Sequence, residues 1–309
     1  MNKILITILF LFSSVCFAIP ANQTCKNELE IDVLQESVDL SGNTQYLVGL
    51  NTYRANTYVG CNYFISFGKG SGTDYNRKLY LNYPSVSIPI QIVKGISDSS
   101  VLMDFPELNS YTNALSGSYP NYPIPNPPYY SFLIKLGTIP FEVPSGTYQD
   151  TFRISLYAGT LNNPDFEDSE SVIVKYFVPK RIALSLVPTG SSFNEFATEI
   201  NMNFGNMQTG LTLNFDTIIK SNSGYNLYFS SENGGKLMHE SLGQYVGYTT
   251  TINGTNISLI PNTPVLVSSS TGATGADGKR LNVKFTLNGV NSQPSGNYKD
   301  YITVSVQSN

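Results

Sequence analysis

The sequence predicts an all-β protein built from two β-sandwich domains in tandem, the second of which lacks its last strand. Short runs of alternating apolar residues recur along the chain between turn clusters, and no stretch has a convincing helical period. The motif Pro-Ser-Gly-x-Tyr-x-Asp occurs twice, at Pro144–Asp150 and Pro294–Asp300. A strand pattern follows each copy, so we interpret the chain as two related β domains.

The two copies of the motif differ in what comes after them. The first leads into a strand over 152–156, a turn over 158–169 and a further strand over 171–178. The second leads into a final strand, and the sequence then ends. A sandwich without its closing strand exposes core side chains and an unpaired edge. We therefore predict that this edge accepts a strand from elsewhere, through the residues on its apolar face: Tyr298, Ile302, Val304 and Val306.

Residues 1–18 are expected to be a secretory signal peptide, with Lys3 before an apolar run and a small-x-small cleavage site ending at Ala18. The mature chain is then expected to begin at Ile19. After cleavage, Cys25 and Cys61 are the cysteines that remain. In an exported protein their default fate is a disulfide bond, and we predict that they form one.

We place the N-terminal domain at 19–178 and the C-terminal domain at 179–309, with the border near Val178-Pro179-Lys180-Arg181. Strands are expected in the first domain over 63–67, 77–83, 86–93, 131–136, 152–156 and 171–178. In the second they are expected over 182–187, 200–204, 211–219, 225–229, 246–252, 281–287 and 298–306. Short strands at such spacing indicate sandwiches.

The composition argues against several functions. Charged residues are 13% of the chain, the formal net charge is −4 and the sequence shows no basic patch, which argues against nucleic acid as a partner. His239 is the only histidine, so we expect neither a His/Cys metal cluster nor a His-based nucleophile, and we interpret it as a surface-loop residue. The acidic run at 165–170 is interpreted as a solvated hairpin tip. We expect no enzyme activity and no cofactor.

A Tyr/Pro-rich segment, 116–130, is expected to be an extended loop, since its prolines exclude a central strand. Its bulky side chains either cap the end of the sandwich or stay exposed as an adhesive contact surface. Both interpretations remain open. The candidate contact residues are Tyr119, Tyr122, Ile124, Tyr129 and Tyr130.

These motifs resemble a known family. Pro-Ser-Gly-x-Tyr-x-Asp before a terminal strand is similar to the end of the spore coat U-type domain, which is found in pilins of the archaic chaperone–usher pathway. The stretches 221–237 and 246–254 resemble central strands and turns of that family. The first domain matches more loosely, through Cys25, Cys61, 63–67 and 144–157. The two-domain layout resembles the tip adhesin of such pili.

The resemblance implies immunoglobulin-like sandwiches and donor-strand complementation. The expected partners are a periplasmic pilus chaperone, an outer-membrane usher, an adjacent pilin subunit and an abiotic or host surface. Localisation is expected at the cell surface, at the pilus tip, after export through the periplasm. Only 19–24 precede Cys25 after the expected cleavage, too few residues for a donor strand, which favours the tip position. The alternative is a free secreted two-domain β-sandwich binding protein.

Overall fold

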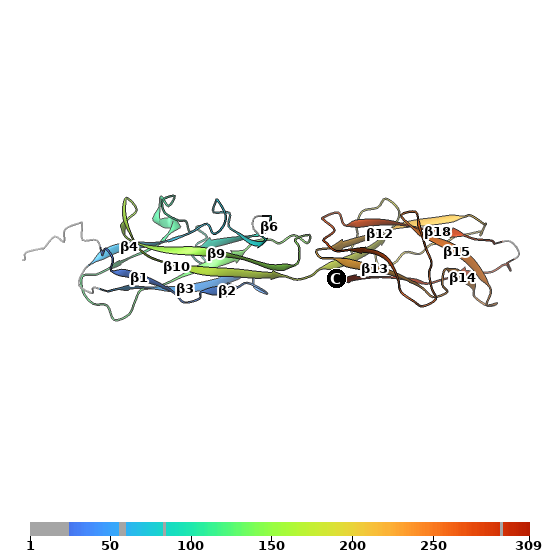
Figure 1. Ribbon diagram of the computed structural model, residues 1–309, viewed down its shortest axis with the longest axis horizontal. Helices are drawn as coiled ribbons and strands as arrows, with labels where there is room; N and C mark the ends of the chain where they lie inside the picture. Colours follow the sequence, from blue (N-terminus) through green and yellow to red (C-terminus); the bar gives the residue numbers. More distant parts are fainter. Residues whose placement is uncertain (1–24, 56–59, 83–84, 291–292) are drawn as a thin grey trace, which may run out of the picture.

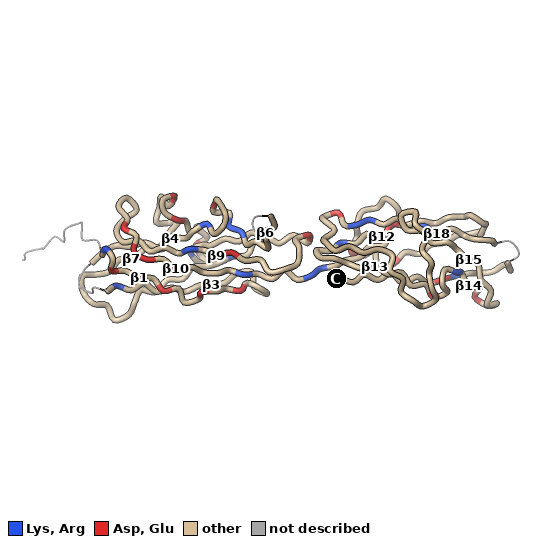
Figure 2. Tube along the Cα trace, viewed as in Figure 1, with Lys and Arg blue, Asp and Glu red and all other residues tan. Residues whose placement is uncertain are grey.

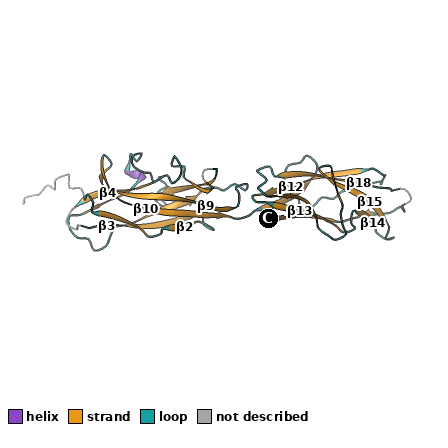
Figure 3. Cartoon of the chain, in the orientation of Figure 1, coloured by secondary structure: helices purple, strands orange, loops and turns teal. Residues whose placement is uncertain are grey.

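The computed structural model describes residues 25–55, 60–82, 85–290 and 293–309. The expected signal peptide and the segment 19–24 lie outside the described residues. Strands dominate these ranges, with one short 3-10 helix, η1 (Tyr111–Asn113), among the described residues (Figure 3). Figure 1 shows two elongated bodies joined end to end, with the C-terminus beside the junction. The protein is thus all-β, with two β-sandwiches in tandem, as the sequence predicts.

Within the described residues, the first body holds ten strands. They are β1 (Leu29–Val33), β2 (Ser37–Asp39), β3 (Gln45–Arg54), β4 (Cys61–Phe67), β5 (Lys78–Asn82), β6 (Val86–Val93), β7 (Leu115–Tyr119), β8 (Tyr129–Leu136), β9 (Gly146–Thr160) and β10 (Asn163–Val178). They pair in the order β1-β3-β8-β6-β5-β9-β10-β2, with β4 joining β7 to β9. The curled sheet encloses a core in which inward-facing side chains such as Phe132, Phe152 and Ile154 are fully buried.

The second body also holds ten strands in the part that the structure describes. They are β11 (Ile182–Val187), β12 (Thr212–Ser221), β13 (Tyr225–Ser231), β14 (Lys236–His239), β15 (Tyr245–Ile252), β16 (Thr255–Ile257), β17 (Val265–Ser270), β18 (Lys279–Leu287), β19 (Tyr298–Lys299) and β20 (Ile302–Ser308). One sheet runs β11-β12-β18-β15-β14-β19, with β16 beside β15, and the other runs β17-β13-β20. The expected strand at 200–204 is absent, and β14, β16 and β17 were missed because they are short or polar.

The structure corrects the expected limits of two segments in the first body. The segment 116–130 is not one loop, because β7 runs to Tyr119 and β8 begins at Tyr129, leaving a loop at 120–128. The turn expected at 158–169 is only 161–162, since β9 and β10 extend as one long hairpin.

The acidic run is therefore not a solvated tip but part of β10, where it serves strand β1. Carboxylate oxygens of Glu167 accept the N–H groups of residues 28 and 29, at 2.9 and 3.2 Å. Asp168 accepts the N–H of Ile31 at 3.0 Å, and Glu170 accepts that of Val33 at 2.8 Å. Because buried N–H groups need acceptors, these side chains replace a ladder of carbonyl oxygens between β1 and β10.

The repeated motif adopts the same local structure in both bodies. Tyr148 donates its hydroxyl hydrogen to Pro144 O and Tyr298 does the same to Pro294 O, each at 2.9 Å. Each motif glycine has positive φ, 147° at Gly146 and 153° at Gly296. A Cβ on Gly296 would lie 2.2 Å from His239 Nε2, so only glycine fits that turn.

The bodies meet at Asn222, which follows β12. Its side-chain amide donates to Val143 O at 3.1 Å and Pro179 O at 2.9 Å, and its Oδ1 accepts the N–H of Arg181 at 2.6 Å. Its main-chain O accepts the N–H of Ser145 at 3.0 Å. One residue of the second body thereby contacts both the segment 179–181 between the bodies and the start of the first body's motif.

Candidate functional site

The core-facing side chains of the strand that follows the motif are fully buried in the first body and only partly buried in the second. Phe152, Ile154 and Leu156 of β9 are each 0% exposed. Their counterparts 150 residues later on β20, which are Ile302, Val304 and Val306, are only partly buried against the second core. The sequence at both places is an alternating β strand, so the difference comes from what lies beside it.

The neighbours of the two strands explain this difference. Strand β9 lies between β4 on one side and β10 on the other. Strand β20 pairs with β13 in the register in which β9 pairs with β4, so β13 is the counterpart of β4. Within the described ranges no strand pairs with the other edge of β20, where the counterpart of β10 would lie.

The backbone of β20 leaves alternate polar groups unpaired along this open edge within the described ranges. Glu232 N–H donates to Tyr301 O and Asn309 N–H donates to Gly224 O, each at 2.9 Å. These bonds assign the odd-numbered residues to the hydrogen-bonded pairs with β13. In an antiparallel ladder the alternate residues direct their N–H and C=O groups to the opposite side. Ile302, Val304 and Val306 therefore present backbone groups to the open edge while their side chains face the core.

The opposite wall of this opening is the segment 197–207, which follows β11. Leu186 N–H donates to Ala197 O at 2.7 Å, and beyond that bond the segment belongs to no strand. Ile200, Met202 and Phe204 alternate with exposed residues and pack partly against the core. The expected strand at 200–204 thus has the right alternation and an extended course, but the part of the chain that the structure describes gives it no ladder partner. We call the opening between β20 and 197–207 the acceptor groove.

The far end of the acceptor groove widens into a cavity of about 390 Å³. Its lining comes from both walls: 202–205, Met207, Leu237 and 296–300. The second body's β14 and β15 lie at the end remote from the first body in Figure 1. Since β14 pairs with β19, this cavity lies toward that remote end.

The start of β20 is fixed by Asp300. Its carboxylate accepts the Ser231 hydroxyl at 2.6 Å and the Tyr248 hydroxyl at 2.5 Å. It also accepts the N–H of Asn233 at 3.1 Å. Burial raises the pKa of Tyr248, and its hydrogen bond to the Asp300 carboxylate raises it further, so the phenol stays a donor at any physiological pH. These hydrogen bonds therefore fix the position of this edge of the groove.

His239 is a buried residue of β14, not a surface-loop residue. It is 8% exposed, and its ring meets Tyr298 edge-on with centroids 4.9 Å apart. Its Nδ1 accepts the N–H groups of Ser241 and Leu242 at 3.1 and 3.2 Å. The ring thus supports the motif turn. Nothing in the sequence distinguished this role, because a lone histidine carries no periodic signal.

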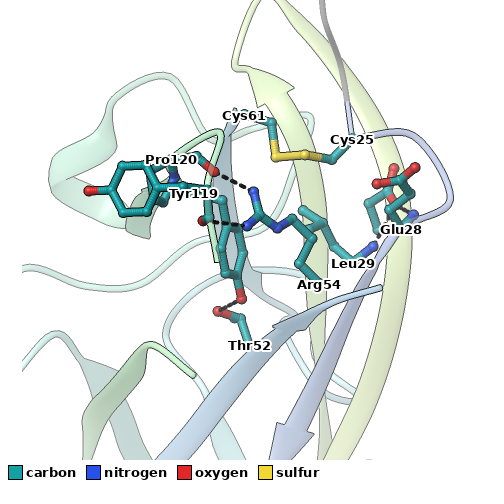
Figure 4. The surroundings of a disulfide bond; sticks show 10 residues. Cys25, Glu28, Leu29, Thr52, Arg54, Cys61, Tyr119 and Pro120 are labelled. Carbon is teal, nitrogen blue, oxygen red and sulfur yellow. Dashed lines mark hydrogen bonds between the residues drawn. A yellow bond between two sulfur atoms is a disulfide. The ribbon is translucent and has the colours of Figure 1, made fainter. Parts of the chain in front are cut away.

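At the other end of the molecule, Cys25 and Cys61 form a disulfide bond, as predicted (Figure 4). Beside it, Arg54 Nη1 donates to Pro120 O at 2.6 Å and Nη2 donates to Tyr122 O at 3.2 Å. The Arg54 guanidinium also lies 4.8 Å from the centre of the Tyr119 ring. These contacts hold the base of the 120–128 loop at the end of the first body remote from the second.

The five residues predicted as a contact surface separate into two groups. Tyr119 is 4% exposed and donates its hydroxyl hydrogen to Thr52 Oγ1 at 3.0 Å, so it lies in the core and not on the surface. Tyr130 is half-buried and shares a hydrogen bond with the Tyr63 hydroxyl at 2.7 Å, while Ile124 packs partly against the core. Tyr122 and Tyr129 remain 61% and 60% exposed. The first group, Tyr119, Ile124 and Tyr130, thus packs against the core, whereas Tyr122 and Tyr129 are exposed to solvent.

The 120–128 loop carries no charged residue. It is therefore tan throughout in Figure 2, where acidic and basic residues are scattered along both bodies. A cavity of about 200 Å³ lies beside it, lined by 52–54, Tyr119 and 124–127. No group of three or more His, Cys, Asp or Glu side chains within the described ranges is placed to hold a metal ion. In the same ranges no helix is long and apolar enough to cross a membrane.

No family model matches the chain, and no curated protein matches it. Among solved structures, the chain is similar to a chain of the chaperone–tip adhesion subunit pre-assembly complex from archaic chaperone–usher Csu pili of Acinetobacter baumannii. The identity is 13% and the TM-score 0.41, over 90% of this chain and 100% of that one. It is also similar to the CupB6 tip adhesin from Pseudomonas aeruginosa, with 12% identity and a TM-score of 0.37, over 90% and 94% of the two chains.

A third similar structure is a mutant of the CFA/I adhesin CfaE of enterotoxigenic E. coli, with 11% identity and a TM-score of 0.37, over 94% of this chain and 89% of that one. These structural neighbours are thus tip adhesins and chaperone–adhesin complexes of chaperone–usher pili. At such low identities and TM-scores, the similarities carry no argument about what this chain does.

Proposed function

We propose that the chain is the tip adhesin subunit of an archaic chaperone–usher pilus, a structural and adhesive protein and not an enzyme. Its second domain, 179–309, accepts a strand in the acceptor groove, first from a periplasmic chaperone and then, at the outer-membrane usher, from the adjacent pilin subunit. Its first domain, 19–178, contacts abiotic or host surfaces. In this proposal, residues 1–18 direct export, and the subunit ends at the pilus tip on the cell surface.

The observation that carries the proposal is the contrast within the chain between Ile154 and Val304. Both face a core from the same place in the same motif strand, yet Ile154 is fully buried and Val304 is not. In the first domain β10 supplies the covering strand. A strand of the same kind in the acceptor groove would bury the second set and pair the open backbone edge of β20.

The first domain also indicates how the incoming strand should lie. Strand β10 is antiparallel to β9, and Val172 and Val174 stand opposite Phe152 and Asp150. By this template the donated strand runs antiparallel to β20, and we propose that it covers Val306, Val304 and Ile302 with apolar side chains at alternate positions that continue toward the cavity. Filling about four such positions would contribute roughly 6–12 kcal/mol, at ~1.5–3 kcal/mol each, before the cost of ordering the strand.

The proposed surface contact uses the 120–128 loop, which lies at the opposite end of the molecule from the groove cavity. Tyr122 of this loop and Tyr129, the first residue of β8, offer exposed rings that can lie on apolar surfaces and also donate a hydroxyl hydrogen. The prolines reduce the entropy that the loop loses on binding. This arrangement supports a subunit that is held at one end and makes contact with the other.

Extension of the chain tests strand acceptance. A short turn and an alternating apolar strand are added after Asn309, so that the strand can return along β20 as β10 returns along β9. The matched control carries the same strand with its alternate apolar residues changed to serine. We expect the apolar strand, but not the control, to raise the melting temperature of the second domain and to prevent aggregation. Equal behaviour of the two extended chains and the original chain would reject the proposal.

The alternative function is a free secreted β-sandwich binding protein with a complete second domain. It predicts a stable monomer on gel filtration whose second domain the added strand does not stabilise. The same experiment therefore separates the two functions.

The contact surface is tested with the double variant Tyr122→Ser/Tyr129→Ser, measured by attachment of piliated cells. Both side chains are exposed, so the melting temperature should not change while attachment weakens. Tyr119 is left intact because it belongs to the core. If attachment of the folded double variant equals that of the original protein, the loop is not the adhesive site.

A further inference from the structure

A second cavity, of about 280 Å³, lies on the first body between the β5–β6 hairpin and the end of β8. Its lining includes apolar surface from Pro89 and Leu136, beside Ile90, which is 4% exposed and belongs to the core. It shares no lining residue with the cavity beside the 120–128 loop or with the acceptor groove. The residues that remain in its lining are Asn76, Arg77, Lys78, Gln91, Lys135 and Gly137.

Every charged residue in this lining is basic. Arg77, Lys78 and Lys135 meet there, although the protein as a whole has a formal net charge of −4. Within the described ranges none of the three forms an ion pair with a carboxylate within 4 Å. The strand neighbours do not compensate either, because Lys78 stands opposite Pro89 and Lys135 stands between Gln45 and Gln91.

Arg77 is the unusual member of this set, since it is 1% exposed. Its guanidinium donates to the main-chain O atoms of Phe67, Gly68 and Leu102, at 2.7, 2.8 and 2.6 Å. It also donates from Nη1 to Gln91 Oε1 at 3.2 Å. All four acceptors are uncharged, whereas buried cations are normally paired with an anion.

The Arg77 guanidinium has one N–H group that makes no hydrogen bond to the described residues. A guanidinium has five N–H groups, and the four bonds above leave one on Nη1 without an acceptor among the described residues. Gln91, which holds Nη1, is itself fixed by donating from Nε2 to Tyr75 O at 2.9 Å. Burial lowers the pKa of Arg77 to about 10, with Tyr75 and Asp104 opposing the shift, so the group stays cationic at neutral pH.

We propose that this cavity is a glycan site that binds a sulfate or phosphate group carried on a sugar. The anionic group lies among Arg77, Lys78 and Lys135, where it provides the missing counter-charge, and the sugar ring lies against the apolar surface of Pro89 and Leu136. Planar guanidinium and flexible ammonium donors suit such oxyanions. The site is separate from strand acceptance and from the 120–128 loop, so it stands independently of the proposed function.

The test uses the full chain and measures binding by calorimetry at low ionic strength. The probes are a heparin oligosaccharide, its chemically desulfated form and a hexose phosphate. The desulfated form tests whether sulfate is needed, and the heparin oligosaccharide and the hexose phosphate together distinguish sulfate from phosphate as the recognised group. The site variant is Lys78→Gln/Lys135→Gln, which leaves the buried Arg77 in place. The control variant, Lys279→Gln/Lys284→Gln, makes the same charge change on exposed residues of the second body.

We expect the sulfated oligosaccharide or the hexose phosphate to bind, and the site variant to bind on the order of tenfold more weakly than the control variant, since two partly exposed charge contacts are lost. Added salt should weaken binding to the original protein. The proposal is overturned if neither anionic probe binds, if the desulfated oligosaccharide binds as well as the sulfated one, or if both variants lose affinity equally. Melting curves confirm that both variants are folded.

Discussion

Ile154 and Val304 occupy equivalent places in the two bodies, and truncating each to alanine compares a closed core with an open one. Ile154 is 0% exposed on β9. Ile154→Ala should therefore cost about 3 kcal/mol, because the lost transfer energy is joined by the cost of the cavity left behind. Val304 is only partly buried. Val304→Ala removes two methyl groups and should cost about 1 kcal/mol of stability in the unmodified chain, roughly half of what two fully buried methyl groups contribute.

A strand in the acceptor groove should raise the stability cost of Val304→Ala and leave the cost of Ile154→Ala unchanged. With the apolar strand added after Asn309, Val304 becomes buried on both sides, and Val304→Ala should then cost about 2 kcal/mol. Calorimetric melting of the full chain measures both, with each kcal/mol shifting the transition of a body of this size by about 3–4 °C. If Val304→Ala costs as much without the added strand as with it, the groove is already closed and the reasoning fails.

Three further predictions concern stability. Replacing Cys25 and Cys61 by serine opens a loop of 36 residues and should destabilise the first body by about 3–4 kcal/mol in the chain-entropy model, measured by urea denaturation. Glu170→Ala leaves the N–H of Val33 without its acceptor and should cost about 1–3 kcal/mol, whereas Glu170→Gln keeps an oxygen in place and should cost less; equal costs would contradict the role of the acidic run. Burial raises the pKa of Asp216, but hydrogen bonds from Asn282, Gly190 and Arg280 outweigh it and hold that pKa below its usual value. Its stabilising effect is thus present above the unfolded pKa of about 3.9 and is lost as the pH falls through the folded pKa, so Asp216→Asn should flatten the acid limb of the second body's stability curve; an unchanged acid limb would contradict this.

The sequence was sufficient for the features that repeat or alternate. The offset of 150 residues between the two motifs predicted equivalent strands, and Tyr148 and Tyr298 make the same hydrogen bond. Alternation located most long strands of both bodies. The exported context predicted the disulfide between Cys25 and Cys61.

The features that the sequence missed depend on contacts between distant segments. Carboxylates at 165–170 indicate a solvated turn unless β1 is known to bring its N–H groups beside them. Tyr119 looked like its neighbour Tyr122 because both lie in a proline-rich stretch, and only the position of Thr52 across the sheet explains why Tyr119 is buried. The cavity around Arg77 left no local signal, since its lining is assembled from β5, β6 and β8.

Amide hydrogen exchange along β20 tests the central claim most directly, because one strand holds both the probe and its control. Thr303 and Ser305 pair with β13, whereas the N–H groups of Ile302, Val304 and Val306 face the acceptor groove. We predict rapid exchange at these three amides in the unmodified chain and slow exchange once the apolar strand follows Asn309, with Thr303 and Ser305 protected in both proteins. Protection of Ile302, Val304 and Val306 in the unmodified chain, or rapid exchange that the added strand does not slow, would contradict strand acceptance.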